Sequence, residues 1–156
     1  MPEKLQNHLD ESIKLELNLA KLYTVLNDSF AEDEEFWWEL AMEEQGHASL
    51  LQQEKKQPQQ KEFFPENLLA KDLQSLIDTN IKITGLIVAY TATTPSRAEA
   101  FQTAYALEMA AGESHFQQFL DSPTNSYSAT IFKQLNQEDR DHAARIMQYM
   151  QNNLIE

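Results

Sequence analysis

Several residue types are scarce or missing in this chain of 156 residues, and each absence removes a class of protein. It contains no cysteine, which excludes disulfides, thiolate metal sites and thiol catalysis. Only 3 glycines and 5 prolines are present, so a turn-rich sandwich or barrel is disfavoured and long helices are expected. Lysine and arginine number 12 against 25 acidic residues, and a formal charge of -13 repels nucleic acid and anionic lipid surfaces while attracting cations.

Long hydrophobic runs are also missing. The longest apolar-rich stretch, residues 81–92, is too short to span a bilayer, and the first residues, MPEKLQNHLDES, lack the apolar region of a signal peptide. A chain of this length suits one domain with a real core. We therefore expect a single soluble, cytoplasmic domain over residues 1–156, with neither nucleic acid nor membrane as a partner.

Apolar residues recur at three- and four-residue steps, which predicts amphipathic helices. The predicted helical segments are 3–28, 33–56, 68–91, 96–120 and 129–153. Ser96 and Glu99 fit a capping box at the start of the fourth segment. The short connection after the first segment predicts an antiparallel hairpin, and the third segment can return along the outside. The fold class is therefore all-α: an antiparallel four-helix bundle with an additional helix in the crossover between the second and third core helices.

Each predicted core helix carries an acidic residue near its midpoint, within the apolar row. These residues are Glu16, Glu44, Glu108 and Asp139. Carboxylates buried in a bundle without partners cost several kcal/mol each or must take up protons. Bound cations would remove that penalty.

The second and last core helices share a short sequence pattern. Residues 40–48 read LAMEEQGHA and residues 135–143 read LNQEDRDHA. A three-residue step places Glu44 with His47 on one helix face, and Asp139 with His142 on another. Each helix can therefore offer an oxygen and an imidazole nitrogen to one point. With Glu16 and Glu108, this makes four carboxylates and two histidines for two metal ions.

These residues carry a resemblance to the ferritin-like di-iron carboxylate proteins, closest to the rubrerythrin branch without its rubredoxin domain. Tyr23 stands seven positions after Glu16, where that family has an aromatic residue, and His115 stands at the matching place after Glu108. In two places the chain departs from the family. Asp139 stands where the family usually has Glu, and Ala111 stands where rubrerythrins often carry a further carboxylate.

The resemblance implies a ferritin-like bundle that holds two Fe ions, or alternatively Mn, with or without an oxo bridge. Glu16 and Asp139 would be terminal or chelating ligands, and Glu44 and Glu108 bridging ones. Tyr23 and His115 would stand beside the metals. The implied activity is an oxidoreductase reaction with dioxygen or hydrogen peroxide, of the peroxidase or ferroxidase type. Electrons would come from an external donor or from the iron itself, because the chain has no cysteine-ligated iron centre.

Two other functions stay open at this point: iron or manganese storage without turnover, and a purely structural role as a helical interaction protein. The sequence also leaves open whether the chain forms a homo-oligomer. Glu113, in the setting Ala-Ala-Gly-Glu, is the rival to Glu108, and His115 is equally well explained as a metal neighbour or as a core histidine.

Other residues have simpler interpretations. Glu43 and Glu138 are expected to be solvated, and His8 is expected at the surface. The acidic run 32–35 suits a helix start because it favours the helix dipole. The aromatic residues Trp37, Trp38, Phe101 and Phe119 are expected to serve packing.

Overall fold

The computed structural model describes residues 3–56, 66–120 and 127–156, with side chains described for 6–53, 55–56, 73–110, 138 and 141–156. This part of the chain is all helical. Its α-helices are α1 (Glu3–Ser29), α2 (Glu34–Lys56), α3 (Glu66–Ala92), α4 (Arg97–Leu120) and α5 (Tyr127–Asn152). The all-α prediction is confirmed, and each predicted segment matches a helix to within two residues at either end.

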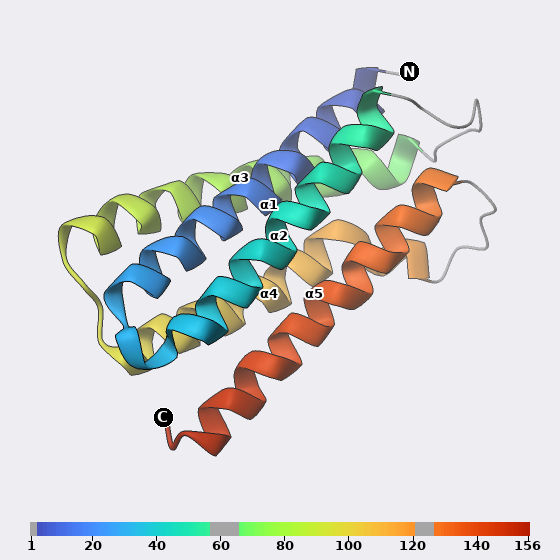
Figure 1. Ribbon diagram of the computed structural model, residues 1–156. Helices are drawn as coiled ribbons and strands as arrows, with labels where there is room; N and C mark the ends of the chain where they lie inside the picture. The colour runs from blue at the N-terminus through green and yellow to red at the C-terminus, as the bar shows by residue number, and fades with distance from the viewer. Residues whose placement is uncertain (1–2, 57–65, 121–126) are drawn as a thin grey trace.

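Helices α1 and α2 form the predicted antiparallel hairpin (Figure 1). Phe30 ends α1 in an extended conformation, with φ -127° and ψ 91°. The short 3-10 helix η1 (Ala31–Asp33) then reverses the chain into α2. The acidic residues of the run 32–35 occupy the first turns of η1 and α2, where they favour the helix dipole as expected.

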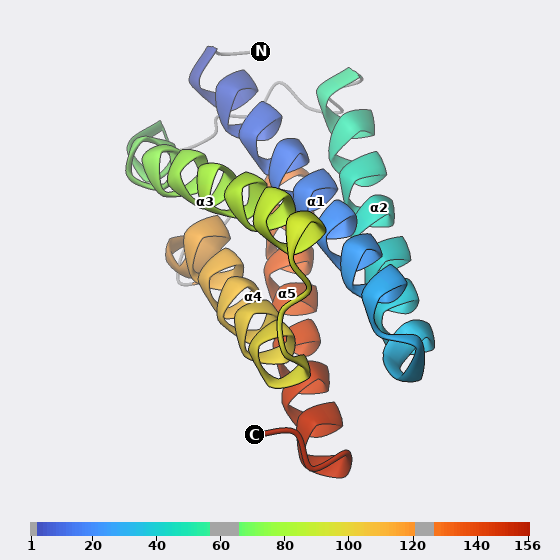
Figure 2. The same cartoon turned by 90° about the vertical axis from the view of Figure 1, so that its left-hand side faces the viewer.

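Helices α4 and α5 form a second pair, and α3 connects the two pairs. Ser96 caps α4, because its hydroxyl oxygen accepts a hydrogen bond from the backbone N–H of Glu99 at 3.1 Å. Figure 2 shows α3 lying across α1, with its end close to α4, and both helices contact it. Helix α3 therefore packs against α1 and α4 and also contributes to the core. Its buried residues are Leu76, Ile83, Ile87 and Tyr90.

The core consists of one hydrophobic cluster drawn from all five helices. Its largest fully buried side chains are Trp37, Tyr23 and Phe101. The packing role expected for Trp37 and Phe101 is thus confirmed, whereas Phe119 lies outside the described side chains. Trp38 was expected to pack as well, but it is 55% exposed because it follows Trp37 by about 100° around α2. No helix in the described stretches is both long enough and apolar enough to cross a membrane.

His8 is buried, which corrects its expected surface position. Four-residue steps along α1 place His8, Ser12 and Glu16 in one row on the inward face, and all three are fully buried. Burial lowers the pKa of His8 to about 4, so its imidazole is neutral at pH 7. A row of polar side chains therefore lies on the buried face of α1 and leads toward the middle of the molecule.

Asp33 is also buried, so it does more than begin a helix. Arg97 donates two hydrogen bonds to it, from Nε at 2.8 Å and from Nη2 at 2.6 Å. The hydroxyl of Tyr149 donates a third, at 2.7 Å. Asp33 therefore joins the α1–α2 turn to the start of α4 and the end of α5.

Replacing Asp33 with alanine should lower the free energy of unfolding by about 2 to 3 kcal/mol, because Arg97 and Tyr149 lose a charged acceptor that is shielded from water. Urea denaturation measures this loss. The control is Glu32→Ala, since Glu32 also lies near Arg97, at 3.6 Å, but its side chain is 62% exposed. That change should cost less than about 0.5 kcal/mol. Equal losses in the two variants would contradict the buried role of Asp33.

Candidate metal centre

Five of the predicted ligands meet in the middle of the molecule. Glu16 comes from α1, Glu44 and His47 from α2, Glu108 from α4 and His142 from α5. The three carboxylates are fully buried, and the histidines are 8% and 2% exposed. Their potential ligand atoms form two groups, in each of which all atoms lie within 4.8 Å of one another. The groups are Glu16, Glu44 and His47, and Glu44, Glu108 and His142.

Glu44 belongs to both groups and directs a different oxygen toward each histidine. Its Oε2 lies 3.4 Å from Nδ1 of His47, and its Oε1 lies 2.7 Å from Nδ1 of His142. Nδ1 of His47 is also 3.6 Å from Oε2 of Glu16, and Nδ1 of His142 is 3.5 Å from Oε1 of Glu108. One carboxylate thus lies between two similar sets of one oxygen and one nitrogen. This arrangement suits a bridging ligand between two cations.

The electrostatics of the cluster are unfavourable without a cation. Burial raises the pKa of Glu44 to about 8, with a further rise from the charge of Glu108. Burial and the nearby Glu44 raise the pKa of Glu16 well above its ordinary value. Glu16 and Glu44 therefore resist ionisation in their buried positions.

The two histidines respond in the opposite direction. Burial alone would lower the pKa of His142, but the close contacts and negative charge of Glu108 and Glu44 outweigh it and raise the pKa to about 11. The pKa of His47 is raised as well, because Glu16 and Glu138 together outweigh burial. The anionic surroundings therefore favour positive charge at both imidazoles, and a bound cation supplies positive charge at the same place.

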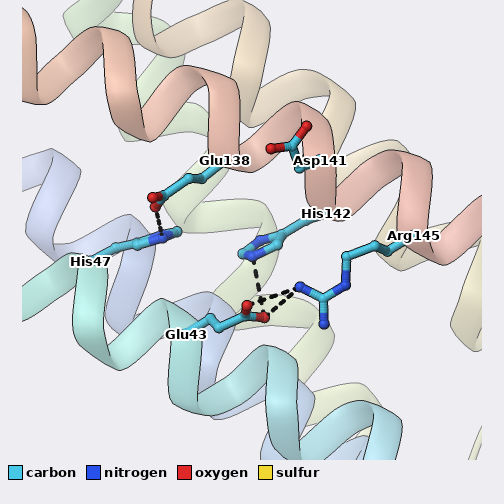
Figure 3. A pocket seen from close by; sticks show the side chains of 6 residues that line it. All are labelled: Glu43, His47, Glu138, Asp141, His142 and Arg145. Atoms are coloured by element: carbon cyan, nitrogen blue, oxygen red, sulfur yellow. Dashed lines mark hydrogen bonds and ion pairs between the residues drawn. The ribbon is translucent and has the colours of Figure 1, made fainter.

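Both imidazoles also meet a carboxylate on their outer side, and these contacts cross between helices (Figure 3). Nε2 of His47 on α2 contacts Glu138 on α5, and Nε2 of His142 on α5 lies 3.5 Å from Glu43 on α2. When a cation displaces the inner proton of such a histidine, a carboxylate at Nε2 keeps the other proton there, and the Nδ1 lone pair then faces the cation. Arg145 in turn donates two hydrogen bonds to Glu43, at 2.9 and 2.7 Å.

The outer face of the cluster opens into a pocket of about 470 Å³. Its lining residues are Glu43, His47, Glu138, Asp141, His142 and Arg145, as Figure 3 shows. Three of these six side chains are carboxylates, which attract cations. The pocket therefore gives small molecules and metal ions an approach to both histidines.

Buried polar atoms of the cluster support its fit to metal ions. Within the described part of the chain, Oε2 of Glu108 has no hydrogen-bond partner, and the contacts of Glu44 with Nδ1 of the two histidines are ion pairs and not aligned hydrogen bonds. A buried polar atom without a partner costs about 1 to 3 kcal/mol. Carboxylate oxygen and imidazole nitrogen form the donor set that suits Fe(II) and Mn(II). The residues present therefore fit such ions.

Tyr23 lies directly beside this cluster. Its hydroxyl donates a hydrogen bond to Oε1 of Glu108 at 2.6 Å, and the ring is fully buried. Such a short bond to a carboxylate orients Glu108 toward His142. The structure thus places Tyr23 against Glu108, one of the predicted ligands.

Three further residues are candidate ligands or neighbours of the metals: Asp139, His115 and Glu113. Their side chains lie outside the described residues. Glu108 is brought to the cluster, and its bridging role stays a prediction because it belongs to the His142 group alone. Glu138 corrects an expectation. It is 37% exposed but contacts His47 instead of being merely solvated.

The repeated pattern contained a signal for these outer carboxylates. Glu43 and Glu138 occupy the same place in it, one residue before Glu44 and Asp139. Judged on its own helix, each lies four residues from a histidine and off the centre of the apolar row. Across the interface of α2 and α5, each meets the histidine of the opposite helix.

Comparison with protein families finds no family model that matches the chain, and comparisons with curated proteins and with solved structures find no match either. The function must therefore be inferred from the site.

Proposed function

We propose that this chain is a ferritin-like, rubrerythrin-like protein that binds two iron ions, or less favourably two manganese ions, and reacts with hydrogen peroxide or dioxygen. The observation that carries the proposal is the position of Glu44. It is buried between two histidines from different helices and turns one oxygen toward each. Site-bearing helices α1, α2, α4 and α5, with α3 as the crossover, fit the ferritin-like bundle.

Within this proposal, each group of side chains would hold one ion. Glu16 and His47 would bind the first, Glu108 and His142 would bind the second, and Glu44 would join the two. Asp139 is proposed as a further ligand from the sequence alone. When bound, the ions supply the redox chemistry, and their open positions accept the oxidant.

The surrounding side chains have separate tasks. Glu138 and Glu43 hold the histidines so that Nδ1 faces inward. Tyr23 fixes the orientation of Glu108 through its hydroxyl. The apolar side chains of the core keep bulk water from the inner face, while the pocket at Glu138 and Arg145 gives the oxidant and a reductant access.

Metal loading followed by peroxide tests the proposal. Protein titrated anaerobically with Fe(II) should bind about two ions per chain, as six protein ligands in two sets imply. Hydrogen peroxide should then oxidise the bound Fe(II) much faster than it oxidises Fe(II) in the same buffer. A colour-forming Fe(II) chelator measures the remaining ferrous iron after rapid acid quenching.

Other results would support other functions. Two bound ions that are oxidised no faster than free Fe(II) would indicate storage without turnover. No bound ion at all would indicate a structural helical protein. A stoichiometry near one would contradict the dinuclear site.

A further inference from the structure

A continuous row of aromatic rings leads away from the proposed metal site. Tyr23 stacks on Trp37, with ring centroids 5.6 Å apart. Trp37 then contacts Phe36 at 5.4 Å and Phe101 at 4.5 Å. Both phenylalanines also contact Tyr149, at 4.2 Å and 5.3 Å. Each of the two phenyl rings therefore lies between Trp37 and Tyr149.

The tyrosines at the two ends of this row each have an acceptor for the hydroxyl proton, whereas Trp37 in the middle has none for its indole proton among the described residues. The hydroxyl of Tyr23 donates to Glu108 at 2.6 Å, and the hydroxyl of Tyr149 donates to Asp33 at 2.7 Å. Nε1 of Trp37 is buried with no hydrogen-bond partner among the described residues. Tyr149 itself is partly exposed, so the row runs from the site to the edge of the core.

We propose that Tyr149 is a redox-active side chain that delivers single electrons through Trp37 and Tyr23 to the proposed metal site. This inference rests on the proposed function, because it needs an oxidant at that site. Tyrosine and tryptophan are the side chains of the row that can lose one electron. Phe36 and Phe101 act as bridges, because rings in van der Waals contact shorten the gap that an electron must cross.

The step balances with hydrogen peroxide as the final electron acceptor. Peroxide, reduced to two molecules of water, takes two electrons from this route, one at a time, and two protons from solvent. Tyr23 loses an electron and passes its phenol proton to Glu108. An electron from Trp37 then restores Tyr23, and the proton returns from Glu108.

Tyr149 completes the transfer. It gives an electron to oxidised Trp37 and its phenol proton to Oδ1 of Asp33, which leaves a neutral tyrosyl radical at position 149. A one-electron reductant in solution, such as ascorbate, then restores Tyr149, and the proton on Asp33 returns to the phenolic oxygen.

The direction of transfer follows from the acceptors. Oxidised Trp37 has no acceptor for its indole proton among the described residues, so it stays a strongly oxidising cation. It therefore takes an electron from Tyr149. The hydroxyl of Tyr149 already donates to Oδ1 of Asp33 at 2.7 Å, so an acceptor for its phenol proton is in place. Tyr149 also stands at the partly exposed end of the row, where a reductant in solution reaches it. Tyr149 is therefore the side chain where the radical comes to rest.

Peptide mapping with a radical trap tests the inference. Di-ferrous protein is treated anaerobically with peroxide and a nitroso spin trap, and mass spectrometry locates the covalent adducts. In the natural sequence, adducts should concentrate on Tyr149. In Trp37→Phe they should fall severalfold at Tyr149, and in Tyr149→Phe they should appear instead on Trp37 or Tyr23.

The matched control is Tyr90→Phe, since Tyr90 is buried in the same core and its hydroxyl contacts Thr103. This variant should keep the natural adduct pattern. Thermal melting checks that each variant is folded. Rapid oxidation of Fe(II) without an adduct at Tyr149, or with the same adduct yield in Trp37→Phe, would overturn the inference while leaving the proposed function intact.

A metal-free measurement keeps the two ideas separate. The chain has 2 tryptophans, so Trp38→Phe leaves Trp37 as the remaining one. Adding Tyr23→Phe leaves Tyr149 as the remaining tyrosine in the row of rings that contains Trp37. A short ultraviolet laser pulse photoionises the buried Trp37, and transient absorption follows the loss of the tryptophan radical as a tyrosyl radical forms. The transfer should be independent of protein concentration, and Tyr149→Phe should slow it severalfold. An unchanged rate would refute the route even if no metal binds.

Discussion

Glu44→Gln should weaken metal binding at both proposed positions at once. The amide loses the charge and one of the two oxygens that face His47 and His142. The affinity should fall by more than the roughly 10- to 100-fold that loss of an outer partner of a ligand costs. Saturation should fall from about two ions per chain to one or none. Anaerobic titration with Fe(II) or Mn(II), followed by metal analysis after gel filtration, measures both quantities.

Variants of the unshared carboxylates sharpen this test. Glu16→Gln and Glu108→Gln should each remove one ion and leave the other bound, because each carboxylate belongs to one group. The control is Glu39→Gln, on the same helix as Glu44 but 52% exposed, which should bind two ions normally. Two ions retained in Glu44→Gln would place this carboxylate outside the site.

Without metal, the protein should become less stable as the pH rises from about 4.5 to about 8. The pKa of Glu44 is raised to about 8 by burial, so the folded state keeps its proton where the unfolded state has lost it. The unfolded state then binds fewer protons, and stability falls with rising pH across this window. Above about 8 the loss from Glu44 is complete, on the order of 5 kcal/mol.

Comparison with a variant gives the contribution of Glu44 together with its effect on the pKa values of Glu16 and His142. Glu44→Gln carries no titrating group at that position, so the metal-free variant should lose less stability from pH 5 to pH 8 and should exceed the natural protein at pH 8. His8 acts in the other direction: its pKa is lowered to about 4, so stability falls as the pH drops below about 6.5. Because His8 is present in both proteins, its contribution cancels in their difference.

Urea denaturation at several pH values gives that difference, with a chelator present throughout. Metal added at pH 8 should stabilise the natural protein far more than Glu44→Gln, since metal binding takes the place of protonation in neutralising the cluster. Parallel pH profiles for the two metal-free proteins would show that Glu44 ionises freely in the fold.

The features that depend on one helix were predictable from the sequence. Three- and four-residue periodicity gave the segments, and the capping pattern at Ser96 gave the start of α4. The carboxylates of Glu16, Glu44 and Glu108 could be found because charge within an apolar row is anomalous on any single helix. For these residues the helical repeat alone fixes the inward direction.

Features that depend on contact between helices were missed. Glu138 and Asp33 look like ordinary surface charges until the neighbouring helix supplies His47 to one and Arg97 to the other. Trp38 looks like a core residue until the position of α2 turns it outward. Periodicity gives the face of a helix, but it gives neither the partner across an interface nor how far packing extends around the helix.

The crossed contacts of Glu138 and Glu43 make the two helix pairs interdependent. The α1–α2 pair holds His47, but its outer carboxylate belongs to α5, and the reverse is true of His142 and Glu43. Glu44 from one pair also serves the histidine of the other. The second group of ligands, Glu44, Glu108 and His142, draws on both helix pairs, whereas the first comes from α1 and α2 alone. Occupancy of the second group by metal would therefore report directly on whether the two pairs have docked.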